Sequence, residues 1–225
     1  MNDGIVLHFA PGSCARVPLI ALEEAGASFE TRLVAYLAGD HRKPGFLALN
    51  PSGKVPVLEI DGEVLTQNSA ILTYLARRYP AAGLLPYAGE PLAAAQVLSQ
   101  LVWFSADLHP LVTRIRMPQF FCDLPCGPER VREMGCAGMA FQLAPLERAL
   151  GKAPWVLGSA WSVLDAYLFW VWFRITGAGF DGAPFPNIAA HFERMGERPA
   201  VGRALAREDA AQAQLAARGL TVPLA

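Results

Sequence analysis

Apolar and polar positions in the first part of the chain alternate in a way that predicts short strands and helices in turn. Four short apolar runs typical of strands occur at residues 5–9, 29–34, 55–60 and 64–65. Two stretches with apolar residues at helical spacing occur at residues 16–25 and 69–79. Asp61-Gly62, between the last two strands, is typical of a hairpin turn. The expected order is strand, helix, strand, a polar and turn-rich segment at 39–49, then strand, strand and helix.

The pattern changes after Pro80, where a stretch rich in glycine, proline and alanine is typical of a linker. Beyond it every apolar pattern has helical spacing, and helices are predicted at residues 92–111, 128–150, 162–176, 188–196 and 199–217. We therefore expect an α/β domain followed by an all-helical domain. The expected boundaries are an N-terminal domain of residues 1–82, a linker of residues 83–91 and a helical domain of residues 92–225.

Composition and charge narrow the class of protein. Of the 225 residues, 53% are hydrophobic and 17% are charged, which is typical of a globular chain with a sizeable core. The net charge of −1 argues against a nucleic-acid partner, which normally needs a basic face. The apolar run at 166–173 is far shorter than the roughly 20 residues that cross a bilayer, so no membrane partner is expected. The N-terminal residues lack the pattern of a signal peptide, and we expect a cytoplasmic location.

The cysteines do not form a metal-binding pattern. The sequence has four of them, namely Cys14, Cys122, Cys126 and Cys136. None belongs to a CxxC pair, and no histidine or second cysteine pair completes a zinc site. We expect reduced thiols and no metal.

One cysteine stands where its chemistry could matter. The segment Ala10-Pro11-Gly12-Ser13-Cys14-Ala15-Arg16-Val17 joins the first predicted strand to the first predicted helix. The positive potential at a helix N-terminus stabilises a thiolate, so Cys14 is a candidate for sulfur chemistry. The alternative is a small buried residue that packs the helix on the sheet.

A second local motif indicates structure rather than chemistry. Ser162-Val163-Leu164-Asp165 precedes the most apolar run of the chain. A serine at the N-cap and an acidic residue three positions later form a capping box, in which each side chain bonds the other residue's amide. We expect this pair to begin a buried helix.

Taken together, the order of elements and a set of short motifs resemble the cytosolic glutathione transferase superfamily. The motifs are Pro11-Gly12-Ser13-Cys14, Asn50-Pro51-Ser52-Gly53-Lys54-Val55-Pro56, Leu65-Thr66-Gln67-Asn68-Ser69-Ala70-Ile71, Ser162-Val163-Leu164-Asp165-Ala166-Tyr167 and Arg198-Pro199-Ala200-Val201. The resemblance spans nearly the whole chain. It implies a thioredoxin-like N-terminal domain, glutathione as co-substrate, a detoxification role and a homodimer.

The resemblance also implies how glutathione would be held. The proline that matches Pro56 is cis in this family, which turns the backbone of Val55 toward a peptide-like ligand. Gln67 and Asn68 match the positions that bind the γ-glutamyl group, although the family usually has an acid and a serine there. Asn68 could instead act only as the N-cap of the following helix. His41 and Lys54 match candidates for the glycine carboxylate, and a solvated charged loop is the alternative for His41.

The residue that activates the thiol is left open between two neighbours. No tyrosine precedes Tyr36, so the tyrosine type of active site is not expected. Pro-Gly-Ser-Cys resembles the bacterial beta class, whose motif ends in the active-site cysteine, here Cys14. His109 matches an active-site histidine of that class. Ser13 is the rival, because a hydroxyl donor also favours a thiolate.

Two features depart from the pattern of the beta class. Ala15 stands where the beta class usually has serine, and the segment around His41 is closer to theta-type sequences. The main hypothesis is conjugation of glutathione to a small hydrophobic electrophile, held by the helical domain near Trp103, Phe104, Leu108 and Met117. The alternatives are thiol–disulfide exchange through Cys14 and a non-catalytic binding or regulatory protein on the same scaffold.

Overall fold

A computed structural model describes residues 4–86 and 90–220 of the chain. Contacts divide the chain into two compact units. The first unit contains the chain up to Leu84 together with the stretch from Glu197 onward, and the second is Leu85–Gly196. Each unit is described by itself. Part of the expected linker, residues 87–89, lies outside the described residues.

A four-stranded mixed sheet forms the centre of the first unit. Its strands are β1 (Ile5–Phe9), β2 (Phe29–Leu33), β3 (Val57–Ile60) and β4 (Glu63–Thr66), in the spatial order β2-β1-β3-β4. β1 pairs parallel with β2 and antiparallel with β3, and β3 pairs antiparallel with β4. The predicted order of strands and helices is confirmed. The antiparallel pairing places the C-terminal end of β1 beside the N-terminal end of β3.

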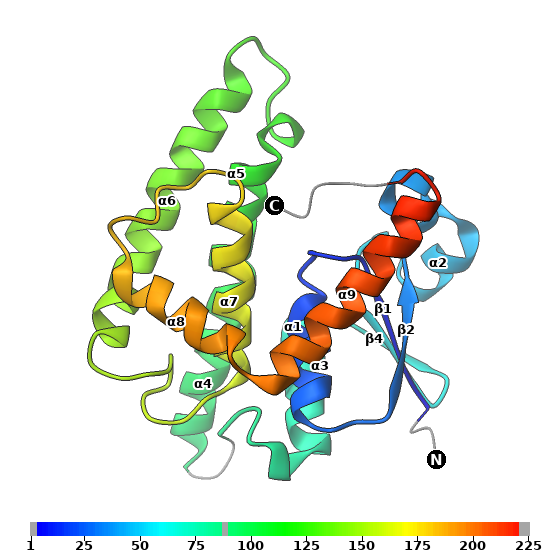
Figure 1. The fold of residues 1–225 in the computed structure, drawn as a ribbon, viewed down its shortest axis with the longest axis horizontal. Coiled ribbons are helices and arrows are strands. Elements are labelled where there is room, and N and C mark those ends of the chain that lie inside the picture. The colour runs from blue at the N-terminus through cyan, green and yellow to red at the C-terminus, as the bar shows by residue number, and fades with distance from the viewer. Residues whose placement is uncertain (1–3, 87–89, 221–225) are drawn as a thin grey trace. The chain divides into compact units, whose positions relative to one another are not determined.

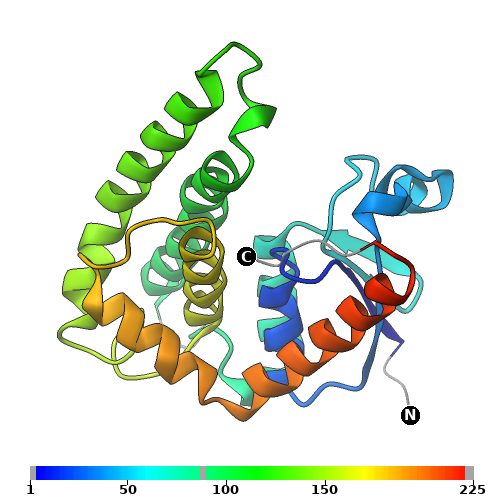
Figure 2. The same ribbon diagram turned by 45° about the horizontal axis from the view of Figure 1, so that its top comes forward.

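Helices cover both faces of this sheet. α1 (Arg16–Glu24) and α3 (Asn68–Arg78) lie on one face, and α2 (Pro44–Leu49) lies on the other (Figure 2). The His8 ring meets the Phe46 ring of α2 edge-on, with centroids 6.0 Å apart. Because side chains alternate along a strand, Leu7 and Phe9 point to the α1 face, where both are buried. α2 was not predicted, since it is a single short helix inside the polar segment expected to be irregular.

The last helix, α9 (Pro199–Ala217), lies beside α1 in Figures 1 and 2. Contacts group it with the first unit, whereas the expected boundaries put it in the helical domain. Ion pairs hold the two helices together: Glu23 of α1 accepts from Arg203 at 2.7 Å and from Arg207 at 2.6 Å. The Arg207 guanidinium also lies 4.3 Å from the centroid of the Phe29 ring. These charged contacts join α9 to α1 within the first unit.

The regular elements described in the second unit are helices. The unit comprises α4 (Pro91–Trp103), a π-helical segment η4 (Phe104–Leu108), α5 (His109–Arg116), α6 (Gly127–Leu150), α7 (Val163–Thr176) and α8 (Pro186–Gly196). Single-turn 3-10 helices also occur along the chain, at η1 (Tyr36–Ala38), η2 (Asp40–Arg42), η3 (Pro80–Ala82) and η5 (Pro118–Phe120). Among the described residues, none of the helices is both long enough and apolar enough to cross a bilayer.

α7 is the buried centre of the helical unit, and the predicted capping box at its start is confirmed. The Ser162 amide donates to Asp165 Oδ2 at 2.9 Å, and the Leu164 amide donates to Ser162 Oγ at 3.3 Å. Asp165 Oδ1 also accepts from the Val156 amide at 2.8 Å and lies 2.9 Å from His191 Nε2. The box therefore extends into a buried polar network that joins α7 to α8.

Candidate functional site

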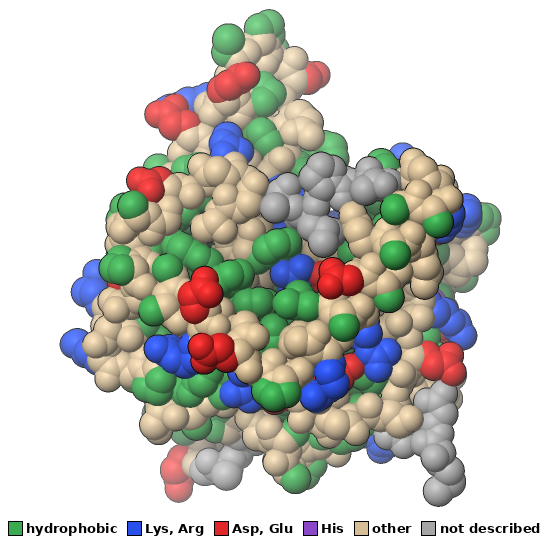
Figure 3. Space-filling view, viewed as in Figure 1, with side chains coloured by type: hydrophobic (Ala, Val, Ile, Leu, Met, Phe, Trp, Pro, Cys, Tyr) green, Lys and Arg blue, Asp and Glu red, His purple; other side chains and the backbone are tan. Residues whose placement is uncertain are grey.

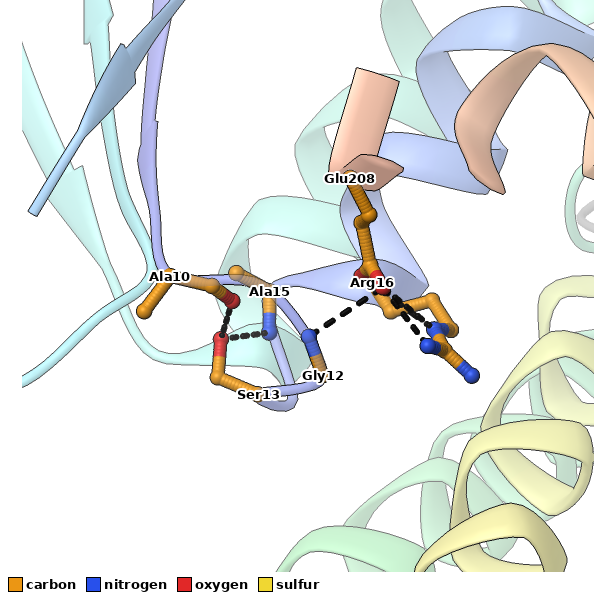
Figure 4. Close-up of polar contacts among 6 residues, drawn as sticks. All are labelled: Ala10, Gly12, Ser13, Ala15, Arg16 and Glu208. Atoms are coloured by element: carbon orange, nitrogen blue, oxygen red, sulfur yellow. Dashed lines mark hydrogen bonds and ion pairs between the residues drawn. The ribbon is translucent and has the colours of Figure 1, made fainter. Parts of the chain in front are cut away.

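The turn between β1 and α1, residues 10–15, is held by its own hydrogen bonds. Ser13 Oγ donates to the Ala10 carbonyl at 2.7 Å and accepts from the Ala15 amide at 3.3 Å (Figure 4). α1 begins at Arg16, whose amide donates to the Ser13 carbonyl at 3.0 Å. Ser13 and Cys14 therefore lie in this 10–15 turn, just ahead of the helix. The Ser13 hydroxyl hydrogen already has an acceptor inside the turn.

Cys14 lies at the point where this turn meets β3. Its Sγ donates to the Val55 carbonyl at 3.6 Å. Burial raises the pKa of the Cys14 thiol to about 12, against weaker opposing effects of its own backbone amide, the Asn68 side chain and the Lys54 charge. Desolvation is the largest of these effects, and it favours the thiol over the thiolate. Cys14 is a thiol near neutral pH.

Val55 has both backbone polar groups engaged by side chains. The Val55–Pro56 peptide bond is cis, as the resemblance implied. The Val55 amide donates to the Tyr36 hydroxyl oxygen at 3.2 Å, while its carbonyl accepts from Cys14. Burial raises the pKa of Tyr36, the Val55 bond lowers it, and the charge of a Cys14 thiolate would raise it further. Tyr36 therefore lies beside Cys14 and Val55, a position that its place in the sequence, after the second strand, did not indicate.

Asn68 and Gln67 connect α3 to the same place. Asn68 is buried, and its Nδ2 donates to the Cys14 carbonyl at 3.0 Å. It is the first residue of α3 rather than the N-cap, so the alternative of a purely capping role does not hold. The N-cap is Gln67, which is exposed and has a φ of 70°. A residue other than glycine in this left-handed region stores local strain, which is common at functional sites.

His41 and Lys54 complete the cluster from two loops. The His41 ring stacks on Tyr36 with centroids 4.3 Å apart, and its Nε2 accepts from Arg42 Nε at 3.2 Å. Lys54 is exposed, and its charge lowers the pKa of Cys14. The structure thus brings together one continuous set of contacts, which runs through Asn68, Cys14, Val55, Tyr36 and His41.

A carboxylate from the far end of the sequence also reaches the 10–15 turn. Glu208 of α9 accepts from the Gly12 amide at 3.1 Å and from Arg16 Nη2 at 2.6 Å (Figure 4). Glu208 was not singled out in the sequence. One signal was present: it is the charged member of an otherwise apolar helical stripe, whose other members are Val201, Ala204, Ala211 and Leu215.

The residues expected to bind the electrophile lie in the helical unit and do not share one environment. Phe104 and Leu108 have no exposed surface, and the Phe104 ring lies 5.5 Å from that of Tyr167. These two residues are corrected to core positions, because a ligand could contact them only after the helices moved. Trp103 donates its Nε1 hydrogen to Gln142 Oε1 at 3.2 Å, and Met117 is exposed.

His109 is held inside the same unit by aromatic residues of α7. Its Nδ1 lies 3.2 Å from the Tyr167 hydroxyl oxygen, and its ring centroid lies 4.7 Å from that of Trp170. These contacts fix the orientation of the imidazole. They fit a positioned active-site histidine as well as a core one.

Charge and metal-ligand chemistry do not point to another kind of site. Within residues 4–86 and 90–220, no group of three or more His, Cys, Asp or Glu side chains is arranged to hold a metal ion. Lys and Arg side chains lie among Asp and Glu side chains over the described part of the face in Figure 3. The groups that the structure brings together around Cys14 are thiol, hydroxyl, amide, imidazole and backbone groups.

Comparison with protein-family models gives two matches. Residues 12–78 match the model described as glutathione S-transferase, N-terminal domain. Residues 142–194 match the model described as glutathione S-transferase, C-terminal domain. The first match spans Cys14, Val55 and Asn68, and the second includes α7.

Individual proteins agree with the models along most of the chain. The chain is 31% identical over 207 residues to the glutathione S-transferase GstA of Escherichia coli O157:H7, covering 90% of this chain and 98% of the relative. A sphingomonad glutathione S-transferase complexed with glutathione is 36% identical, with a TM-score of 0.79 over 91% of this chain and 98% of its own. A beta-class enzyme of Sphingomonas chungbukensis is 35% identical, with a TM-score of 0.79 over 90% and 98%.

Proposed function

The chain belongs to the glutathione S-transferase family, and we propose that it conjugates glutathione to a small hydrophobic electrophile. In this proposal the thioredoxin-like domain of residues 1–82 binds glutathione. Residues 83–91 link it to the helical domain of residues 92–225, which contributes the electrophile site. A cytoplasmic homodimer with a detoxification role is the form in which we expect it to act.

The observation that carries this proposal is the state of the Val55 backbone. Its amide and carbonyl are bonded to two side chains, Tyr36 and Cys14, rather than to another strand. A peptide-like ligand that adds as a short strand can exchange with such side-chain partners without breaking the sheet. The cysteinyl residue of glutathione is the portion that fits this exchange, which would direct its sulfur toward Ser13 and Cys14.

The ends of glutathione have candidate partners on both sides of Val55. Gln67 and the buried Asn68 lie at the N-terminus of α3, where the positive end of the helix favours a carboxylate. Gln67 can accept from the γ-glutamyl ammonium through its amide oxygen, without assistance from a charge. His41 and Lys54 supply positive or polar groups for the glycine carboxylate.

The raised pKa of Cys14 favours one role for this residue over another. As a thiol it can donate a hydrogen bond to the glutathione thiolate, which lowers the pKa of the ligand thiol. Ser13 can do the same if it releases the Ala10 carbonyl. The conjugation then forms a carbon–sulfur bond and expels the leaving group of the electrophile. Thiol–disulfide exchange through Cys14 is disfavoured, because the thiolate is the attacking species in that reaction.

The electrophile would lie against the helical domain. Of the residues expected there, Trp103 and Met117 retain surface that a ligand can reach, and His109 has a fixed orientation. We propose these three for the electrophile side. Phe104 and Leu108 support them from the core.

Activity with chlorodinitrobenzene and glutathione tests the proposal. Cys14→Ala and Ser13→Ala are compared with wild type, and Cys136→Ala, a part-buried cysteine of α6, serves as the matched control. We expect at least a roughly tenfold loss of kcat in one of the first two variants and wild-type activity in the control. Equal activity in all four proteins would remove both assigned roles. If the wild type neither binds glutathione nor catalyses the conjugation, the result would favour the alternative of a non-catalytic protein on the same scaffold, which binds another ligand or has a regulatory role.

A further inference from the structure

We propose that Glu208 is a positioning residue for the 10–15 turn, which would hold the sulfur of the ligand. The expected effect on catalysis rests on the proposed function, whereas the effect on the conformation of the turn does not. Glu208 belongs to α9, nearly two hundred residues after the turn in sequence. It acts through the Gly12 backbone amide and the Arg16 side chain, which lie on either side of Ser13 and Cys14 in the sequence.

One carboxylate holds both ends of the segment that carries the reactive side chains. Glu208 Oε2 accepts from the Gly12 amide at 3.1 Å, directly before Ser13. The same carboxylate accepts from Arg16 Nε at 3.2 Å to each oxygen and from Arg16 Nη2 at 2.6 Å, directly after Ala15 (Figure 4). Three residues, Ser13 to Ala15, therefore lie between two anchors on a single side chain.

Gly12 is the part of the turn that most needs such an anchor. Its φ is +70°, and a glycine has almost equal access to positive and negative φ values. Rotation about this residue would turn the Gly12 amide away and carry Ser13 and Cys14 with it. A hydrogen bond to a fixed carboxylate selects one of the available conformations, so the anchor acts on geometry.

Burial makes a purely stabilising role a poor explanation of this ion pair. The exposed fractions of Arg16 and Glu208 are 3% and 1%. The desolvation of two buried charges offsets most of their attraction, and apolar side chains of similar volume often give equal or greater stability. The other inward positions of α9 are apolar. An apolar residue at 208 could pack there, but it could not accept from Gly12 or Arg16.

A second ion-pair network supplies a matched control. Glu23 also joins α1 to α9, through Arg203 and Arg207, and it is also buried. Its described contacts lie at the other end of α1, away from the 10–15 turn. Glu23→Gln therefore weakens the attachment of α9 without changing either anchor of the turn.

The experiment compares Glu208→Gln with Glu23→Gln, using glutathione and chlorodinitrobenzene well below the melting temperature of each variant. For Glu208→Gln we expect kcat to fall about tenfold or more, because misplacement by about 1 Å costs up to about a hundredfold. The KM for glutathione should stay within about twofold, since Val55, Gln67 and Asn68 would still hold the rest of the ligand. For Glu23→Gln we expect a lowered Tm and an unchanged kcat. An unchanged kcat in Glu208→Gln, or an equal loss in both variants, would overturn the proposal.

Hydrogen exchange at Gly12 tests the proposal if Glu208→Gln does not fold, and together with glutathione binding it tests the proposal if the wild type has no activity. Glu208→Asp keeps the charge but is one methylene too short to reach both anchors. Hydrogen exchange of the Gly12 amide should be about tenfold faster in Glu208→Asp than in wild type, whereas the control Glu23→Asp should leave it unchanged. Equal exchange in wild type and Glu208→Asp overturns the positioning role. Failure of the wild type to bind glutathione overturns the proposed function and leaves the exchange result to decide the inference.

Discussion

The hydroxyl oxygen of Tyr36 accepts a hydrogen bond from the Val55 amide at 3.2 Å. This contact places a side chain from the segment after β2 at the backbone group that a peptide-like ligand would use. The Tyr36 ring in turn stacks on His41, a candidate for the ligand carboxylate. Under the proposed function, Tyr36 and glutathione would compete for the Val55 amide hydrogen.

Tyr36→Phe is expected to strengthen glutathione binding. The variant loses the internal acceptor, so the ligand no longer has to displace it, and a net hydrogen bond is worth about 0.5–1.5 kcal/mol. The Kd measured by calorimetry should fall roughly two- to tenfold. Tyr74→Phe on α3 is the control and should leave Kd unchanged. Weaker binding by Tyr36→Phe would mean that the hydroxyl contacts the ligand instead.

The stability of the protein at alkaline pH should depend on Cys14. The thiol ionises near 9.0 in the unfolded chain and near 12 in the folded protein, so the unfolded state loses its proton first as the pH rises. The free energy of unfolding should therefore decrease from about pH 9 upward in wild type, and less steeply in Cys14→Ala. Urea denaturation of both proteins at about pH 8 and about pH 10.5 measures the difference. Parallel pH profiles would show that the sulfur is not desolvated as described.

Asp165→Ala should be among the most destabilising single changes in the helical unit. It leaves the Ser162 and Val156 amides without their acceptor and removes the partner of the buried His191. Breaking a buried charged network typically costs about 3–5 kcal/mol. Glu129→Ala, which changes an exposed acidic residue in the first turn of α6, is the control. Its free energy of unfolding, measured by urea denaturation, should lie within about 0.5 kcal/mol of that of wild type. A similar small effect for Asp165→Ala would contradict the assigned network.

Much of the fold follows from local patterns, and the exceptions have physical causes. The sheet, α1, α3 and the buried α7 carry clear apolar periods, and the capping box at Ser162 is formed by neighbours in sequence. α2 was missed because its six residues are too few to show a period. α9 is attached to α1 by ion pairs such as that of Glu23 with Arg203, which are 180 positions apart in the sequence. No local pattern records such a pairing.

The site was predictable in its motifs and less so in its contacts. Cys14, Val55 and Asn68 were identified and do lie together, through the bonds from Cys14 to Val55 and from Asn68 to Cys14. The raised pKa of Cys14 comes from burial in the folded protein, which depends on contacts that are distant in sequence. Tyr36 reaches the site from a segment with no local motif, and the one local signal for Glu208 is its place in an apolar stripe, which does not show what it contacts.

The most direct test of the account is a glutathione titration of the isotope-labelled protein, followed by NMR at the Val55 amide. We expect this resonance to shift in proportion to the occupancy of the ligand, because the partner of the Val55 amide would change from the Tyr36 hydroxyl to the ligand. The Val163 amide at the start of α7 is the control and should not move. Saturable binding of glutathione with an unmoved Val55 resonance, or no binding at all, would show that glutathione does not bind through the Val55 backbone.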